Sequence, residues 1–554
     1  MESKKRNFRV SRAFIIVTIV VLGLISAGYF GWSLYKDKFI RDKVSDKVYE
    51  KTNGLYTIRY DNMVLDEVAG DLNITNLTII PDTAKYRQMV ADKINPPLLL
   101  SLYIPELKIR GVKTPKALVD KKVKGSKLEI NNATVVFYYA KAHPDTSANV
   151  VKQEMYQQLL GDLKEIQADT VDVTNVSLAF IDIRNNSRTI EASSISVHLE
   201  DVDIDSLHNH DSTRFFFAKK AEVKGKKGII KNKEGTYFYH FNDFDFTKNG
   251  GFFSIESVQI EPQLSEDKYA AFSKIQKDRF GIIFKNVSLK NINLQQLIQS
   301  NVVADSLIIK KSNIKVYRDR SYPDNNLSTI GKFPQQLLMN LPITLSLKKL
   351  IIKDAYIEYK EKNPKSDYSG KVHFNNASAV ISNITNDLEN IKANRNCIVD
   401  FNARFLDAAL THIRLNLILN DPKGRFMYSG SLEGFEANRL NELTEPLGLA
   451  KIEKGNLNKL NFNFAGHSYG SDGKITLLYD DLKLSLLKKD STEDKLKKKK
   501  LASFVANIII KNSNPTRKEP VRVATVHYIH NTKKSFFNLM WKSVFAGVKQ
   551  TAGM

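Results

Sequence analysis

One segment of the sequence matches the spacing of a serine nucleophile. Gly466, Ser468 and Gly470 fit the pattern G-x-S-x-G, which in hydrolases sets the serine on a sharp turn between a strand and a helix. Here a strand-like segment at residues 460–465 precedes the motif, and a polar turn with a second strand-like segment follows it. This order predicts a hairpin loop, so we expect no catalysis by Ser468.

His208, His210 and Asp211 come closest to a metal-binding set. They lie in a short polar segment that predicts a loop, and no distant ligand at a recognisable spacing accompanies them. The single cysteine, Cys397, rules out an intramolecular disulfide and a multi-cysteine metal site. The sequence also lacks a glycine-rich phosphate loop and an H-E-x-x-H helix. We therefore expect a protein that is not an enzyme and that uses no cofactor or metal.

The composition is that of a folded protein with a strongly basic balance. Of 554 residues, 42% are hydrophobic and 26% are charged, and the formal net charge is +23. Such a length predicts several domains or one elongated architecture. The charge favours anionic surfaces, but the lysine runs lie between strand-like segments and are typical of solvated loops. Because no nucleic-acid recognition motif accompanies them, we expect no nucleic-acid partner.

An uncharged segment near the N-terminus predicts a membrane anchor. Residues 13–35 contain no charged side chain, and as a helix they would reach about 34 Å, enough to cross the hydrocarbon layer. Tyr29, Trp32 and Tyr35 lie at its end, where aromatic side chains favour the membrane interface. Basic residues flank the segment on both sides, so the orientation rests on the short preceding tail, which is typical of a signal anchor with its body outside the cytoplasm.

A unit of eight residues recurs along the rest of the chain. It reads apolar, x, apolar, two polar residues, apolar, x, apolar, and the period of two in each half predicts strands. The two central residues shift the alternation by one. Either a two-residue hairpin or a β-bulge within one strand would return both halves to one apolar face, and the frequent asparagines without glycine favour the bulge. The seven copies centre on Thr75-Asn76, Asn131-Asn132, Thr174-Asn175, Glu200-Asp201, Lys290-Asn291, Lys310-Lys311 and Lys353-Asp354.

This pattern predicts one apolar face along a long sheet, with Glu129, Thr134, Ile308 and Lys315 on the other face. The apolar face is either an open groove or an ordinary closed core. If it is a groove, the side chains that would touch lipid are Leu128, Ile130, Val135, Val171, Val173, Leu178, Leu307, Ile309, Ile314, Leu350, Ile352 and Ile357.

The C-terminal residues predict an amphipathic helix. Its apolar stripe would be too short to cross a bilayer, so the helix would either cap the open end of the sheet or lie in a membrane interface. We expect the cap. The stripe comprises Phe537, Met540, Trp541, Val544, Phe545 and Val548.

Strand patterns over nearly the whole chain resemble those of the AsmA-like proteins of double-membraned bacteria. Residues 54–82 are similar to the opening strands of that family. Residues 451–487, with Gly455, Gly466 and Gly473, are similar to its C-terminal hairpins. The resemblance implies a mainly β fold with a few helices, in which an elongated sheet curls into an apolar groove and an N-terminal helix fixes the protein to the inner membrane.

The resemblance also implies the function. The protein is expected to bind phospholipid acyl chains without catalysis and to promote phospholipid transfer between the inner and outer membranes, in support of outer-membrane assembly. Outer-membrane or other envelope proteins are further candidate partners, and a periplasmic scaffold that docks partners through exposed sheet edges is the alternative. The expected parts are a cytoplasmic tail (residues 1–12), a transmembrane anchor (13–35), a helical connector (36–53), a periplasmic groove body (54–534) and a C-terminal helix (535–554).

Overall fold

The described structure consists mainly of β-strands, which confirms the mainly β part of the expected fold class. The computed structural model describes residues 48–553 apart from 51, 67, 97, 113–120, 141–163, 209–210, 212, 216, 300, 490–495 and 499–510. The expected tail, the expected transmembrane anchor and most of the expected connector therefore lie outside the described residues. Within the part that is described, no helix is both long and apolar enough to cross a membrane.

The chain divides into two compact units. Unit 1 comprises the residues up to Val258 together with Asn291–Ser300, and the boundary between the units falls within β11 (Phe252–Pro262). The elements of unit 1 are β1 (Tyr56–Arg59), β2 (Asn62–Asp66), β3 (Asp71–Pro81), α3 (Thr83–Ala91), β4 (Leu98–Arg110), β5 (Lys122–Asn131), β6 (Thr134–Tyr139), β7 (Glu165–Asp182), β8 (Ser187–Ile204), β9 (Ala218–Lys231), β10 (Tyr237–Thr247) and α7 (Leu294–Ile298).

Unit 2 comprises Gln259–Lys290 and the residues from Asn301 onward. Its elements are α6 (Glu266–Ser273), β12 (Arg279–Lys290), β13 (Val302–Asp319), α8 (Pro334–Met339), β14 (Leu345–Lys362), β15 (Ser369–Thr385), α9 (Leu388–Ala393), β16 (Asn396–Phe405), β17 (Ala409–Ile418), β18 (Phe426–Glu436), a 3-10 turn (Ala437–Leu440), α10 (Asn441–Gly448), β19 (Ala450–His467), β20 (Gly470–Lys489), β21 (Leu496–Lys498), β22 (Ala524–Ile529) and α11 (Phe536–Ala552).

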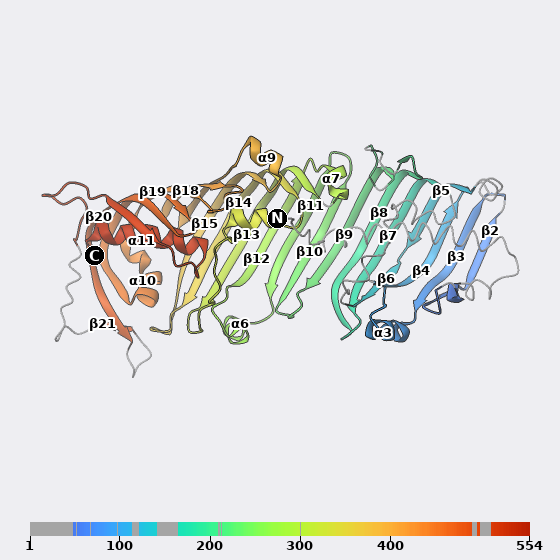
Figure 1. Cartoon of the computed structure of the whole chain (residues 1–554), viewed down its shortest axis with the longest axis horizontal. Coiled ribbons are helices and arrows are strands. Elements are labelled where there is room, and N and C mark those ends of the chain that lie inside the picture. Colours follow the sequence, from blue (N-terminus) through green and yellow to red (C-terminus); the bar gives the residue numbers. More distant parts are fainter. Residues whose placement is uncertain are drawn as a thin grey trace. The chain divides into compact units, whose positions relative to one another are not determined.

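Within each unit the strands lie side by side, mostly as antiparallel neighbours (Figure 1). The exceptions in unit 1 are β5 and β6, which both pair with β4 on one side and run parallel to β7 on the other. They are thus two halves of one interrupted strand. In unit 2, β13 and β14 are parallel, which requires a long crossover connection between them.

The recurring unit is a bend within the strands and not a hairpin, except at Lys290-Asn291, where β12 ends before α7. We call this bend a bulge; the register shifts across it in some strand pairs, such as β14 and β15, and is continuous in others, such as β3 and β4. Ile130 and Ala133 do not pair with each other, because β5 and β6 continue along the same neighbours. In six of the seven copies the second polar residue has a positive φ between 47° and 59°, and Lys311 is the exception. Asn and Asp adopt this left-handed conformation more readily than other L-residues, which explains their frequency at this position. The six are Asn76, Asn132, Asn175, Asp201, Asn291 and Asp354.

The same bulge occurs at five positions that the sequence analysis overlooked. Ser194, Asp243, Asn286, Asn376 and Asp481 also have positive φ, and each is the second polar residue between two alternating apolar pairs. In β4, Pro105 lies between the bulges at Asn76 and Asn132 in the neighbouring strands. A proline without an N–H group is tolerated there, because the ladder of backbone hydrogen bonds is already interrupted.

In unit 2 the crossover between β13 and β14 packs against the C-terminal elements. The N–H of Thr329 donates to the carbonyl of Thr532 at 2.7 Å, and the buried ring of Phe333 contacts the rings of Phe426 and Phe536. Helix α11, drawn in red in Figure 1, lies on β20 and β22. The expected C-terminal helix is therefore present, and it covers part of the apolar face of the sheet.

Candidate functional site

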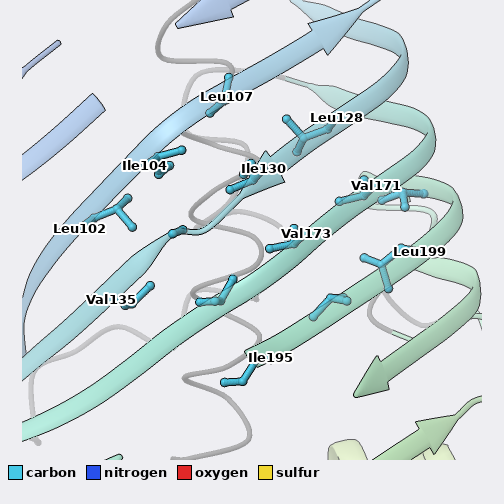
Figure 2. Close-up of a cluster of buried hydrophobic side chains, with 14 of the residues drawn as sticks. Leu102, Ile104, Leu107, Leu128, Ile130, Val135, Val171, Val173, Ile195 and Leu199 are labelled. Carbon is cyan, nitrogen blue, oxygen red and sulfur yellow. The ribbon is translucent and has the colours of Figure 1, made fainter. Parts of the chain in front are cut away.

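The bulges place apolar side chains of unit 1 in continuous rows that run across the strands. One row follows Leu107, Ile130, Val173 and Val197 through the cross-strand pairs of β4, β5, β7 and β8. Figure 2 shows side chains of these strands, including Leu107, Ile130 and Val173, on the same side of the sheet. The predicted shared face is therefore present in unit 1.

These rows in unit 1 form a buried core. Ile104, Ile130, Val135 and Val171 are 0% exposed. The cluster extends from β3 to β10 and includes Leu294 from α7 as a half-buried neighbour. The face of unit 1 therefore has the burial expected of a closed core.

Unit 2 carries the same rows over β12 to β16, but most of their side chains are only half-buried. Three rows cross these strands without a polar side chain. We name them the β12–β16 apolar rows. They are Leu289, Leu307, Leu350, Ile381 and Val399; Val287, Ile309, Ile352, Ala379 and Phe401; and Ile282, Ile314, Ile357, Phe374 and Phe405.

The twelve residues predicted to face lipid divide between these two environments. Six are buried, namely Leu128, Ile130, Val135, Val171, Val173 and Ile309. Six are half-buried, namely Leu178, Leu307, Ile314, Leu350, Ile352 and Ile357. Five of the half-buried residues belong to the β12–β16 apolar rows, so this part of the sheet is the candidate site for an apolar ligand.

The opposite face of unit 1 is polar and carries ion pairs between neighbouring strands. Lys127 Nζ lies 2.8 Å from a carboxylate oxygen of Glu129 and 3.0 Å from one of Asp172. His198 Nδ1 lies 2.6 Å from the other Asp172 oxygen. The hydrogen bond to Asp172 raises the pKa of His198, although burial opposes the change. This face has the charge pattern of a solvated surface.

Ser468 lies in the two-residue turn between β19 and β20, as the sequence predicted. His467 pairs with Gly470 across the turn. The hydroxyl of Ser468 is buried and donates to the carbonyl of Lys423 at 2.9 Å. His530 Nδ1 contacts the carbonyl oxygen of Ser468 at 2.7 Å and not its hydroxyl. The hydroxyl therefore has the contacts of a turn-stabilising group.

His208 and Asp211 lie between β8 and β9, outside the strands, and His208 Nδ1 lies 2.9 Å from a carboxylate oxygen of Asp205. His210 lies outside the described residues. Among the residues that are described, no group of three or more His, Cys, Asp and Glu side chains is arranged to hold a metal ion.

Only half of the predicted apolar stripe of the C-terminal helix packs against the sheet. Met540, Val544 and Val548 pack against the core cluster that includes Ile475 and Val526, whereas Phe537, Trp541 and Phe545 are exposed. The residues that face β20 are small, namely Ser543, Gly547 and Thr551. Their spacing of four was visible in the sequence, but hydrophobicity alone gives such residues little weight.

No protein-family model matches the chain, and no curated protein matches it significantly.

Proposed function

We propose that the chain binds phospholipid acyl chains on the β12–β16 apolar rows and promotes the movement of phospholipid between inner and outer membranes without catalysis. The observation that carries the proposal is the half-exposure of three continuous apolar rows in a protein that buries the equivalent rows of unit 1. The resemblance of the sequence to AsmA-like proteins supports the same function. In this proposal residues 13–35 anchor the chain in the inner membrane and the body is periplasmic.

The energetics favour an apolar ligand at this site. Burial of apolar surface contributes about 25 cal/mol for each Å² removed from water. The partly exposed rows still have apolar surface, and its burial against an acyl chain would be favourable. Ala355, Ala377 and Ala403 are buried, and the partly buried side chains of Ile352, Ile357 and Phe374 pack against them. A lipid headgroup would remain in water, where its charge needs no buried partner.

Photo-crosslinking in cells tests the proposal with neighbouring residues as matched pairs. A photoreactive amino acid at Leu307 or Ile314 should capture phospholipid, because both side chains belong to the apolar rows. The same probe at Ile308 or Lys315 should capture none, since alternate strand residues point to opposite faces. Ile308 is apolar, so this comparison separates position from hydrophobicity. Equal capture from both faces, or none from either, would reject the lipid site and favour a scaffold that docks proteins.

A further inference from the structure

Helix α11 displays three large aromatic side chains to solvent. Phe537 is 69% exposed, Trp541 48% and Phe545 37%. They are spaced four residues apart and therefore lie along one side of the helix. The rings of Trp541 and Phe545 are stacked, with their centroids 5.8 Å apart. Exposed apolar side chains are common singly, but an ordered row of three marks a surface for interaction.

The opposite side of α11 is fixed to the sheet, so the aromatic row cannot turn inward. The hydroxyls of Ser543 and Ser471 are 2.5 Å apart. Gly547 lies against Ile475 and Val526, and the hydroxyl of Tyr428 donates to the carbonyl of Met540 at 3.3 Å. Ser543 and Gly547 are completely or almost completely buried. The aromatic row is thus held outward by the packing of the small residues.

Positive charge accompanies the aromatic row. Lys542 Nζ lies 5.8 Å and Lys549 Nζ 5.2 Å from the centroid of the Phe545 ring. The helix contains no acidic residue. Aromatic rings with flanking lysines on a helix of this length are typical of a helix that lies in the interface of an anionic membrane. The rings would enter the boundary between headgroups and acyl chains, and the ammonium groups would lie beside lipid phosphates.

We infer that the α11 aromatic face, defined as Phe537, Trp541, Lys542, Phe545 and Lys549, docks onto a membrane surface that carries anionic phospholipid. A second copy of this chain is a poorer occupant, because a two-fold contact would place the lysines of one helix against those of the other. Binding of a membrane by this face does not depend on acyl-chain binding by the β12–β16 apolar rows, so the two proposals can fail separately.

Trp541 is a built-in probe of the docking. The chain has two tryptophans, Trp32 and Trp541, and Trp32→Phe leaves only the second. The full-length variant, held in nanodiscs of phosphatidylcholine, is mixed with vesicles whose acyl chains are brominated. Vesicles that contain phosphatidylglycerol should quench Trp541 fluorescence, and added salt should weaken the effect. Vesicles of phosphatidylcholine alone should quench much less.

Variants locate the contact. In the same Trp32→Phe background, replacing Phe537 and Phe545 by Ser should weaken vesicle binding at least about tenfold, because the burial of two large side chains is lost. Lys542→Glu with Lys549→Glu should remove the preference for phosphatidylglycerol. Leu388→Ser is the matched control, since Leu388 is 55% exposed on another helix, and it should bind as the parent does. Trp541 that stays accessible to acrylamide and unquenched by anionic vesicles would overturn the inference. Shielding of Trp541 from acrylamide without vesicles, caused by self-association of the chain, would also overturn the inference.

Discussion

Gly547 of α11 lies so close to Ile475 of β20 that a Cβ atom at position 547 would be 2.0 Å from Cγ2 of Ile475. No side chain larger than hydrogen fits without a shift of the helix. Gly547→Leu should therefore lower the free energy of unfolding by about 1–3 kcal/mol through overpacking, measured by chemical denaturation. Trp541→Ser on the exposed side should leave stability nearly unchanged. A loss of stability in Trp541→Ser as large as that in Gly547→Leu would contradict the observed orientation of α11.

The sequence predicted the existence of α11 but not its orientation. Phe537, Trp541 and Phe545 were expected to face the sheet with the rest of the apolar stripe, because burial of large side chains contributes the most free energy. The helix instead approaches β20 through Ser543, Gly547 and Thr551, where small side chains permit close backbone contact. Close contact depends on the shape of the partner surface, and a hydrophobic pattern holds no information about that shape.

The bulges give a second prediction. Asn286 has a φ of 52° and is exposed in β12, as is its neighbour Lys285. Asn286→Val should destabilise unit 2 by about 1–2 kcal/mol, because a β-branched residue is strained in the left-handed region. Asn286→Gly should retain stability, since glycine adopts positive φ freely. Lys285→Val is the control, and its backbone is outside the left-handed region. A lower unfolding temperature for Lys285→Val than for Asn286→Val would contradict this account.

The repeated pattern could predict the β fold and the shared apolar face, because a strand period of two is independent of what covers the strand. It could not predict where that face is buried. Ile130 and Ile352 occupy the same position in their copies of the repeat. Ile130 is 0% exposed, whereas Ile352 is half-buried beside the small cluster around Ala355. The difference arises from neighbours distant in sequence, which the local pattern does not include.

This pair of residues gives a third prediction. Ile130→Asp would place an unpaired carboxylate in a closed core, and a loss of several kcal/mol is enough to unfold a marginal domain. Ile352→Asp should keep unit 2 folded, because the carboxylate can still reach water, while it should abolish lipid capture by a photoreactive probe at Ile314. Limited proteolysis and circular dichroism distinguish the two outcomes. Unfolding by both substitutions would show that the β12–β16 apolar rows are also a closed core.

A fourth prediction concerns pH. Hydrogen bonding to Asp172 raises the pKa of His198 above its unfolded value of about 6.5. The stabilisation from the charged pair is therefore complete below the unfolded pKa and is lost as the pH rises through the folded pKa. Denaturation midpoints of the parent and of His198→Gln should differ most below the unfolded pKa of about 6.5 and converge as the pH rises through the higher folded pKa of His198. A constant difference across this range would exclude titration of His198 as the cause.

The last prediction separates a structural serine from a nucleophile. Ser468 is 1% exposed, and its hydroxyl donates to the carbonyl of Lys423 at the turn between β19 and β20. Ser468→Ala removes this hydrogen bond, while the N–H of Ser468 still donates to the same carbonyl at 3.0 Å, so the substitution should cost about 1 kcal/mol of stability. Cellular function should persist at normal protein abundance, as should phospholipid capture by a probe at Ile314. Ser468→Thr keeps the hydroxyl but adds a methyl group, so it should also preserve function if it folds. Loss of function in Ser468→Ala with unchanged abundance and stability, and its retention in Ser468→Thr, would indicate chemistry at the hydroxyl instead.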